Sequence, residues 1–329
     1  MTTSARIDTH HHIVPPQYRD WLLSHGETAG GLAIPRWDAD TDLAFMDSQG
    51  IRTAIVSVST PGTHLGDDAE ATTWARKVND YAAEIVKDRP GRYGFFATLT
   101  LPNVDGALDE AARALDELGA DGIVLLANHR GVYLGDPAFE PLMAELGRRG
   151  STVFVHPSEL PGPLVPGLPP YAADFLLDTT RAAMNLVLSG TTARHPDIRF
   201  ILSHGGGFLP YAAHRIALAL QAHQQVGGVQ PVMDHETILA ELRRFYFDTA
   251  LSANPDTLPT LLTFADPTHI TFGSDFPYAG PEMSAYFTRQ LDAYPLDDDQ
   301  RTAVNHSNAR TLFPRLAVDP RPGSGAGRT

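Results

Sequence analysis

The chain has 329 residues, of which 43% are hydrophobic and 19% are charged, and its formal net charge is −14. This apolar content suits a large buried core, whereas the acidic balance, with no basic stripe, argues against a protein that binds the phosphate backbone of nucleic acids. The sequence contains no cysteine, which excludes disulfides, thiolate metal sites and a cysteine nucleophile. No segment has the pattern of a signal peptide or the length of a membrane span, so we expect a cytoplasmic protein.

Eight short apolar segments are predicted to be strands. Most are continuously apolar rather than alternating, which is typical of parallel strands that are covered on both faces. In chain order they are Arg6–His12, Thr53–Ser59, Tyr93–Leu99, Gly122–Leu126, Thr152–His156, Arg199–His204, Phe245–Asp248 and His269–Asp275.

The segments between these strands have the periodicity of amphipathic helices. Three buried faces are predicted: Trp74, Val78, Tyr81, Ala82 and Ile85; Leu108, Ala111, Ala112, Leu115 and Leu118; and Phe139, Leu142, Met143 and Leu146. Gly119, Gly147 and Gly150 are expected to end helices. Alternating strands and helices predict an α/β fold, a (β/α)8 TIM barrel forming a single catalytic domain over residues 1–318. A doubly wound sheet is the alternative.

Three segments are longer than a minimal barrel requires. Residues 17–42 form a small insertion after the first strand, residues 157–173 are crowded with proline, and residues 222–236 precede the seventh strand. The first two follow the carboxyl ends of strands, so in a barrel they would cover the active site. Residues 319–329 are rich in Pro, Gly, Ser and Arg and are expected to form a disordered tail.

Ionisable residues end four of the predicted strands. They are His10, His11 and His12 on the first strand, His156 on the fifth, His204 on the sixth and Asp275 on the eighth. In a barrel all of these ends open onto one face. Because side chains alternate along a strand, His10 and His12 should point the same way and His11 the opposite way.

A single histidine in a strand is usually structural, and a run of three can arise by chance. Buried imidazoles and a carboxylate that converge on one point need a partner, however, and a divalent cation is the simplest one. We therefore predict a site made of His10, His12, His156 and Asp275, whose ligand set suits Zn²⁺, with Mn²⁺ as the alternative. His204, which precedes three glycines, is predicted to be an acid or base; a fifth ligand or a structural residue are the alternatives. Asp275 either binds the metal only or also carries a proton.

Several motifs together resemble the amidohydrolase superfamily. More narrowly, they resemble its decarboxylase branch, typified by aminocarboxymuconate-semialdehyde, 6-methylsalicylate and γ-resorcylate decarboxylases. The motifs are Asp8–His12 followed by Pro15, Phe154–Pro157, Ser203–Gly207, Gly273–Pro277, Gly135–Leu142 and Asn308–Phe313, and the resemblance spans residues 6–316. The γ-resorcylate type carries a glutamate at the first ligand position, where this chain has His10, so the chain is more similar to the other two types.

The resemblance implies a metal-dependent, non-oxidative decarboxylase of a small aromatic, salicylate-like or enolic carboxylic acid, with the same four ligands, and with His204 and Asp275 as catalytic residues. It also implies a homodimer in which Arg215 crosses the interface to bind a substrate carboxylate. Arg36 is a second predicted carboxylate binder. Phe95, Tyr171 and Phe276 are predicted to line a flat apolar pocket, with ordinary core packing as the alternative for each.

Related barrels with two metal ions bridge them through a carbamylated lysine at a strand end. The only lysines here, Lys77 and Lys87, both follow the second strand within a predicted helix, so we expect a single ion. The main rival function is a metal-dependent hydrolase of a lactone, amide or ester, and a hydratase is a further one. A barrel in which the metal is only structural is the rival from another class, although a site at an open barrel mouth has more acid and base groups than stability requires.

Overall fold

The computed structural model describes residues 5–228 and 232–317 of the chain. Eight strands pair in parallel in the order β1-β2-β3-β4-β7-β8-β9-β10, so all eight predicted strands are confirmed. Their bounds are β1 Arg6–His12, β2 Ile51–Ser57, β3 Tyr93–Thr98, β4 Gly122–Leu126, β7 Thr152–His156, β8 Arg199–Leu202, β9 Tyr246–Asp248 and β10 Ile270–Thr271. A short antiparallel hairpin, β5 Asn128–His129 and β6 Val132–Tyr133, follows β4.

The sheet closes on itself where β1 meets the residues that follow β10. The backbone N–H of Thr9 donates to the carbonyl of Phe272 at 2.9 Å, and that of His12 donates to the carbonyl of Phe276 at 2.7 Å. Asp8 and Phe272 also form a parallel bridge. The fold is therefore the predicted (β/α)8 TIM barrel, and the doubly wound sheet is excluded.

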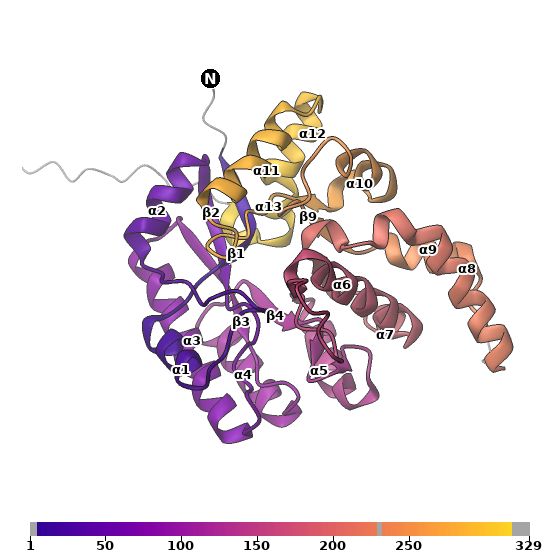
Figure 1. The fold of residues 1–329 in the computed structure, drawn as a ribbon, viewed down its shortest axis with the longest axis horizontal. Coiled ribbons are helices and arrows are strands. Elements are labelled where there is room, and N and C mark those ends of the chain that lie inside the picture. The colour runs from indigo at the N-terminus through magenta and orange to yellow at the C-terminus, as the bar shows by residue number, and fades with distance from the viewer. Residues whose placement is uncertain (1–4, 229–231, 318–329) are drawn as a thin grey trace, which may run out of the picture.

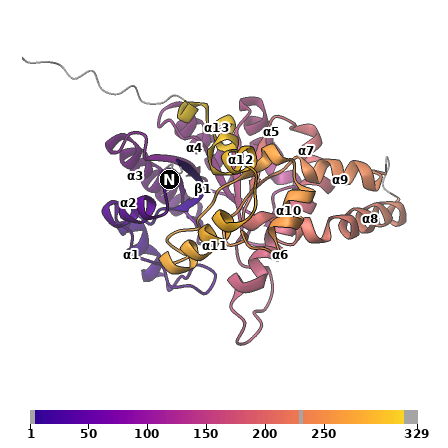
Figure 2. The ribbon, with the colours of Figure 1, turned by 90° about the horizontal axis from the view of Figure 1, so that it is seen from above.

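Helices surround the barrel, as Figures 1 and 2 show from two directions. They are α1 Pro16–Ser24, α2 Ala39–Ser48, α3 Asp68–Asp88, α4 Val104–Asp116, α5 Glu140–Arg149, α6 Pro170–Leu188, α7 Thr191–Arg194, α8 Leu209–Gly227, α9 His235–Arg243, α10 Leu258–Phe264, α11 Pro281–Ala293, α12 Asp298–Thr302 and α13 Asn308–Leu312. In both views α8 and α9 extend away from the barrel. The insertion at residues 17–42 is not a plain loop, because it contains most of α1 and the start of α2.

The three predicted helix faces are confirmed to different degrees. All four residues predicted for the α5 face are buried, and in α3 the centre of the predicted face is buried. In α4 the buried face is rotated from the predicted one: its buried residues are Ala107, Glu110, Ala111 and Ala114, and the predicted leucines beside them are only partly buried. Small alanines allow a helix to approach a sheet closely, which hydrophobicity alone does not predict.

The three predicted stop glycines also differ. Gly150 ends α5 in the left-handed region at φ +61°, and Gly119 follows α4 at φ +71°. The prediction for Gly147 was wrong, since it lies within α5. A Cβ there would lie 3.1 Å from the Cβ of His195, so the glycine serves helix packing rather than helix ending.

The barrel interior is filled by side chains from alternate strand positions. Phe96, Phe154 and Ile201 belong to this inner cluster, and Phe313, after α13, packs against it. The ring centroid of Phe154 lies 4.9 Å from that of His10, so the inner core supports the predicted metal site. Phe95, the neighbour of Phe96 on β3, belongs instead to the core between the barrel and the helices. Its predicted place in a substrate pocket was therefore wrong, because strand alternation turns its side chain into this core.

Within the described ranges, none of the helices combines the length and the apolar character that crossing a membrane requires. The cytoplasmic location stays a prediction. The predicted tail at 319–329 lies outside the described residues, as do residues 229–231 of the segment 222–236; the rest of that segment ends α8 and begins α9.

Candidate metal centre

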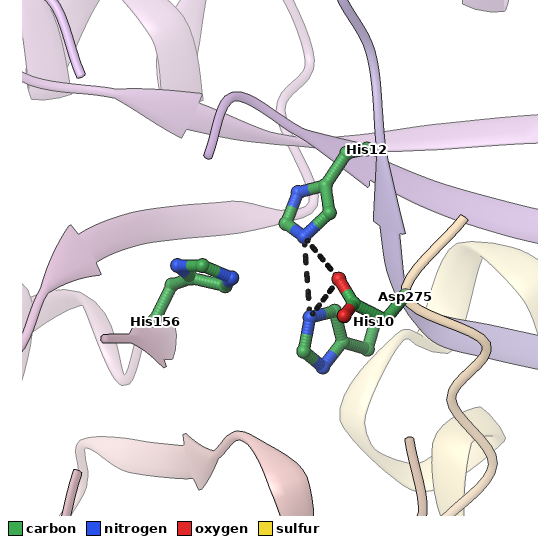
Figure 3. A group of neighbouring side chains, drawn as sticks. All are labelled: His10, His12, His156 and Asp275. Atoms are coloured by element: carbon green, nitrogen blue, oxygen red, sulfur yellow. Dashed lines mark hydrogen bonds and ion pairs between the residues drawn. The ribbon is translucent and has the colours of Figure 1, made fainter. Parts of the chain in front are cut away.

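The four predicted ligands meet at the carboxyl-terminal end of the barrel (Figure 3). One ligand atom from each of His10, His12, His156 and Asp275 lies within 4.8 Å of all the others. All four residues are buried, and Asp275 is the most accessible at 7%. The alternation of β1 places His10 and His12 on the same side, as predicted.

The three imidazoles are all held by their Nδ1 atoms. The Nδ1 of His10 lies 2.8 Å from the carboxylate of Asp248, that of His12 lies 3.1 Å from the Ser57 hydroxyl, and that of His156 lies 2.8 Å from the Pro157 carbonyl. Because a carboxylate or a carbonyl oxygen only accepts, the Nδ1 atoms of His10 and His156 carry the proton, and the Nε2 atom is left for a ligand. Such outer contacts are what orients histidine ligands around a metal.

The distances within the cluster fit one ion. The Nε2 atoms of His10 and His12 lie 3.2 Å apart, and one oxygen of Asp275 lies 3.2 Å and 3.1 Å from them. Two nitrogens about 2.05 Å from a tetrahedral ion would lie roughly 3.3 Å apart. The donor set of three imidazoles and one carboxylate is therefore a metal-binding site suited to a divalent ion.

The charges of the cluster also call for a cation. Burial lowers the pKa of His10, but Asp248 and Asp275 outweigh it and raise that pKa to about 10. Burial lowers the pKa of both His12 and His156, so these two imidazoles are neutral. Burial raises the pKa of Asp275, yet the neighbouring imidazoles, His10 first, hold it well below its usual value. A proton on His10 offsets only one of the two negative charges of Asp248 and Asp275, whereas a divalent ion that replaces this proton can offset both.

His11 points away from the cluster, as predicted. Its imidazole lies between two buried carboxylates, with Nδ1 3.0 Å from Asp8 and Nε2 2.8 Å from Asp42. Asp42 also accepts hydrogen bonds from Trp37 and Tyr93. His11 thus ties β1 to α2, which makes it a structural residue.

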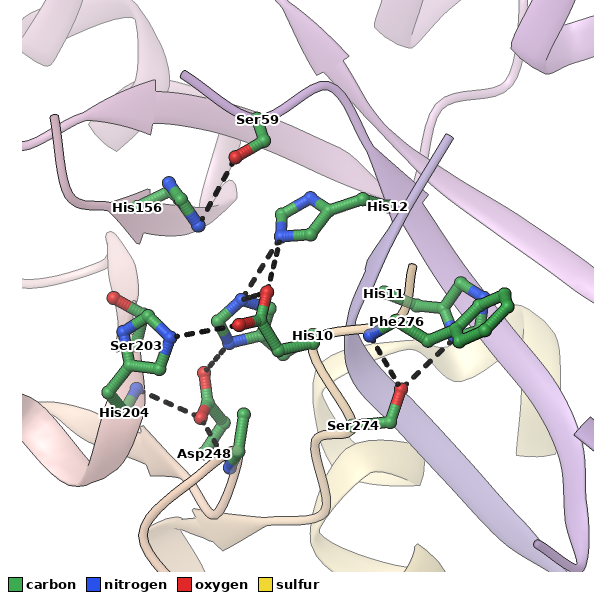
Figure 4. A network of polar contacts seen from close by, with 12 residues as sticks. His10, His11, His12, Ser59, His156, Ser203, His204, Asp248, Ser274 and Phe276 are labelled. Atoms are coloured by element: carbon green, nitrogen blue, oxygen red, sulfur yellow. Dashed lines mark hydrogen bonds and ion pairs between the residues drawn. The ribbon is translucent and has the colours of Figure 1, made fainter. Parts of the chain in front are cut away.

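His204 lies beside His10 and His156 (Figure 4). Its Nε2 is 3.4 Å from the second oxygen of Asp275. It adopts a left-handed backbone conformation at φ +54°, and its N–H donates to Asp248 at 3.0 Å. The glycines that follow are required by space, because a Cβ at Gly207 would lie 2.1 Å from the Leu176 carbonyl and one at Gly206 would lie 2.7 Å from Phe247. The turn therefore packs tightly enough to fix the imidazole at the edge of the cluster.

A cavity of about 470 Å³ opens above the cluster. Asp275, His156 and His204 line its floor. Its walls are largely apolar and are formed by Leu32, Tyr171, Phe175, Leu176, Leu251, Tyr278, Met283 and Phe287, among others. Leu32 and Tyr171 come from the two segments that were predicted to cover the site, which confirms the place of both segments beside the cavity.

Like Phe95, three other residues predicted to bind substrate do not line this cavity. Phe276 stacks on Phe45 with ring centroids 3.9 Å apart and lies in the core, so its predicted place in the pocket was wrong. Arg36 and Arg215 are exposed, and neither lines the cavity. Arg215 lies on α8, which projects away from the barrel.

Sequence reasoning missed two residues of the site. Asp248, which holds His10, ends the predicted seventh strand, so a rule that reads every acidic strand end as part of the site would have found it. Tyr278 lines the cavity, and its ring lies 5.3 Å from that of His12. No spacing in the sequence distinguishes Tyr278 from the core aromatic residues.

Comparisons with known proteins agree with this geometry. A family model described as amidohydrolase matches residues 7–315. The 6-methylsalicylic acid decarboxylase of Penicillium expansum is 40% identical over 318 residues, covering 95% of this chain and 97% of the relative. A decarboxylase of Aspergillus niger is 38% identical, covering 95% and 88%.

One solved structure illustrates the shared fold. A 5-carboxyvanillate decarboxylase of Novosphingobium aromaticivorans, complexed with manganese and 4-hydroxy-3-methoxy-5-nitrobenzoic acid, superposes with a TM-score of 0.84 at 21% identity, covering 95% of this chain and 99% of that one.

Replacing Asp248 with Asn tests whether its carboxylate orients His10 for metal binding. Asp248→Asn removes the charge that holds His10, so we expect the affinity for a divalent ion to fall about 10- to 100-fold. Competition against a chromophoric chelator measures this. Asp178→Asn is the matched control, because Asp178 is equally buried and bonded to Asn128 and Tyr133. An unchanged affinity in Asp248→Asn, or an equal fall in the control, contradicts the prediction.

Proposed function

Because the chain belongs to the amidohydrolase family, and its relatives at 38–40% identity are named decarboxylases, we propose that it is a carboxy-lyase. It removes CO₂ from a small, salicylate-like aromatic acid without oxidation. The observation that carries the proposal is the cavity: acid, base and metal-binding groups form its floor, and apolar side chains suited to an aromatic ring form its walls. The relatives favour this reaction over hydrolysis.

His10, His12, His156 and Asp275 would hold the metal ion. When bound, a divalent cation supplies a positive charge that attracts a substrate carboxylate and an adjacent hydroxyl group. No lysine or arginine lines the cavity among the described residues, so this charge is the principal attraction for the carboxylate.

His204 and Asp275 would carry out the proton transfer, His204 as the donor and Asp275 as the group that positions it. Protonation of the ring carbon that bears the carboxylate interrupts the conjugation of the ring. The bond to the carboxylate then breaks, its electron pair restores the aromatic ring, and CO₂ leaves. His204 suits the donor role, because its Nε2 lies at the cavity floor and Asp275, whose pKa is held low, is ionised. Asp275 holds His204 in position, and solvent returns the proton.

The reaction is tested by incubating the metal-loaded protein with a panel of hydroxybenzoates that includes 6-methylsalicylate. We expect release of CO₂ together with the corresponding phenol, measured by coupled carbonate assay and by chromatography. His204→Asn should reduce kcat at least 100-fold, because general acid catalysis contributes about 10²- to 10⁴-fold. Its metal content should be unchanged.

His223→Asn is the matched control, since His223 is exposed on α8. Hydrolysis of a lactone, amide or ester with no CO₂ from any hydroxybenzoate would refute the proposed reaction.

We propose a single zinc ion. Three imidazoles and one carboxylate are ligands that zinc prefers, whereas manganese favours oxygen ligands. A bridging lysine is also missing from the site, because Lys77 and Lys87 both lie on α3, where the Lys77 ammonium stacks over Trp74 at 4.3 Å.

The metal is identified by plasma mass spectrometry of protein from cells supplied equally with both ions. We expect about one zinc per chain and loss of turnover after chelation, restored by zinc. One manganese per chain, or two ions of any kind, contradicts the zinc proposal but not the reaction.

We further propose that the protein is a homodimer in which Arg215 reaches the partner's cavity. The support is the surface of α8, where Arg215 lies between Tyr211, 86% exposed, and Leu218, 55% exposed. Exposed aromatic and aliphatic side chains beside an arginine are typical of protein interfaces. The proposal also explains how a carboxylate-binding arginine can lie outside its own cavity.

Sedimentation and kinetics test this arrangement together. Arg215→Ala should raise KM for the acid about tenfold, whereas Tyr211→Glu should shift the dimer toward monomers. Arg36→Ala is the matched control, because Arg36 is the other predicted carboxylate binder and is exposed. A monomer with full activity would contradict the proposed role of Arg215. An increase in KM in Arg36→Ala but not in Arg215→Ala would assign carboxylate binding to Arg36 instead.

A further inference from the structure

Backbone strain in the described part of the chain is concentrated around the cavity above the metal site, the first cavity. Four residues other than glycine adopt a positive φ: Arg130 at +54°, His204 at +54°, Leu251 at +51° and Asp275 at +59°. Three of them line the first cavity, whereas Arg130 lines a second cavity of about 420 Å³ at the same end of the barrel. Such strain often marks functional sites. His204 and Asp275 have a role in the proposed reaction, but Leu251 takes no part in it.

Leu251 is held in a turn that does not favour leucine. The turn comprises residues 249–252 after β9, and the Ser252 N–H closes it by donating to the Thr249 carbonyl at 3.2 Å. Leu251 is its third residue, where a positive φ favours glycine or asparagine. A bulky side chain is rare with this backbone conformation. The side chain, rather than the turn, therefore explains why a leucine lies here.

The turn is attached to the metal site by the carboxylate of Asp248. One oxygen of Asp248 accepts the Ala250 N–H at 2.9 Å, and the other holds the Nδ1 of His10 at 2.8 Å. Asp248 and Ala250 are completely buried. The backbone that leads into Leu251 is therefore fixed relative to a metal-binding imidazole. A side chain presented from such a rigid backbone can discriminate between ligands that differ by one small group.

The first cavity has room for more than an unsubstituted ring. Its volume of about 470 Å³ lies within the range that holds drug-sized ligands, roughly 300–1,000 Å³. Leu251 has no side-chain group that forms hydrogen bonds, so a substituent must be apolar to gain from contact with it. An alkyl group that moves from water onto Leu251 gains free energy, whereas a hydroxyl group placed there would lose its hydrogen bonds to water.

Ser252 is the other residue of the turn that could recognise a substituent. It lines the same cavity, and its hydroxyl would favour a ring hydroxyl over an alkyl group. Ser252 is only 6% exposed, however, and it packs against the turn after His204, because a Cβ at Gly205 would lie 3.1 Å from the Ser252 Cβ. Leu251 is less buried than Ser252. Close packing accounts for Ser252, whereas contact with a ligand accounts for the strain at Leu251.

We propose that Leu251 is a specificity-determining residue that contacts an apolar substituent on the ring of the substrate acid. The preferred substrate is then an alkyl-substituted salicylate rather than one with a second ring hydroxyl. That the bound acid loses CO₂ rests on the proposed function. The contact between Leu251 and the alkyl group concerns binding alone, so it can be tested without turnover.

Three nitrophenols test the proposal by calorimetry with the metal-loaded wild-type protein. A nitro group replaces the carboxylate, so no CO₂ can leave, and the second position ortho to it carries methyl, hydrogen or hydroxyl. The compounds are 3-methyl-2-nitrophenol, 2-nitrophenol and 2-nitroresorcinol. We expect the methyl compound to bind about tenfold more tightly than the other two, because one such group in an apolar pocket changes binding by roughly 10- to 200-fold.

Two variants remove the leucine side chain without disturbing the turn. Leu251→Asn and Leu251→Gly both suit a positive φ, so their circular dichroism and metal content should be unchanged. The preference for the methyl compound should disappear in both. Leu262→Asn is the matched control, because Leu262 is also partly buried but lies on α10 and does not line the cavity. This control should keep the preference.

Crystals soaked in 3-bromo-2-nitrophenol locate the substituent directly, because bromine is similar in size to a methyl group and scatters anomalously. We expect the bromine peak in contact with Leu251. Bromine that lies against Met283 or Phe287 instead would overturn the proposal.

The calorimetry can overturn the proposal in three ways: the preference persists in both Leu251 variants, 2-nitroresorcinol binds most tightly to the wild type, or none of the three compounds binds. Loss of the preference in Ser252→Ala but not in the Leu251 variants would also overturn it and assign the recognition to Ser252. If Leu251 confers the preference while no hydroxybenzoate releases CO₂, the role of Leu251 stands and the proposed reaction fails.

Discussion

The bond between Asp248 and His10 is the contact on which the rest of the site depends. One oxygen of Asp248 holds the Nδ1 of His10 at 2.8 Å, and the other accepts the N–H groups of His204 at 3.0 Å and Ala250 at 2.9 Å. A single buried carboxylate thus positions both a metal-binding imidazole and the backbone of the predicted acid. Leaving such a charge without its partner typically costs about 3–5 kcal/mol, so the fold and the site are specified together.

This contact exists because a closed barrel brings distant strand ends together. His10 comes from β1 and Asp248 from β9, 238 positions apart. They become neighbours only because β10 pairs with β9 and the segment after β10 pairs with β1. Asp275 then enters the cluster with its backbone N–H bonded to the His10 carbonyl at 2.8 Å. Asp275 and His204 both adopt left-handed backbone angles, at φ +59° and +54°. Non-glycine residues in this region cost of order 1–3 kcal/mol and often mark functional sites.

The sequence was sufficient to predict the features that depend on hydrophobic periodicity and on which residues end the strands. Continuous apolar runs located all eight strands, and the alternation of β1 separated His11 from His10 and His12. The placement of side chains by packing could not be predicted in this way. Phe95 and Phe96 are equally apolar, and only the register of β3 decides that Phe96 enters the barrel. Gly147 has the sequence pattern of a helix end, but it is a glycine because of its close approach to His195, 48 positions away.

Strand alternation also explains why two cavities form at one end of the barrel. Val58 and Ser59 are adjacent after β2, and their side chains point to opposite sides, Val58 into the second cavity and Ser59 into the first. The hydroxyl of Ser59 lies 3.5 Å from the Nε2 of His156, the atom left free for a metal. The segment that divides the two cavities is therefore also the one whose serine contacts a metal-binding imidazole.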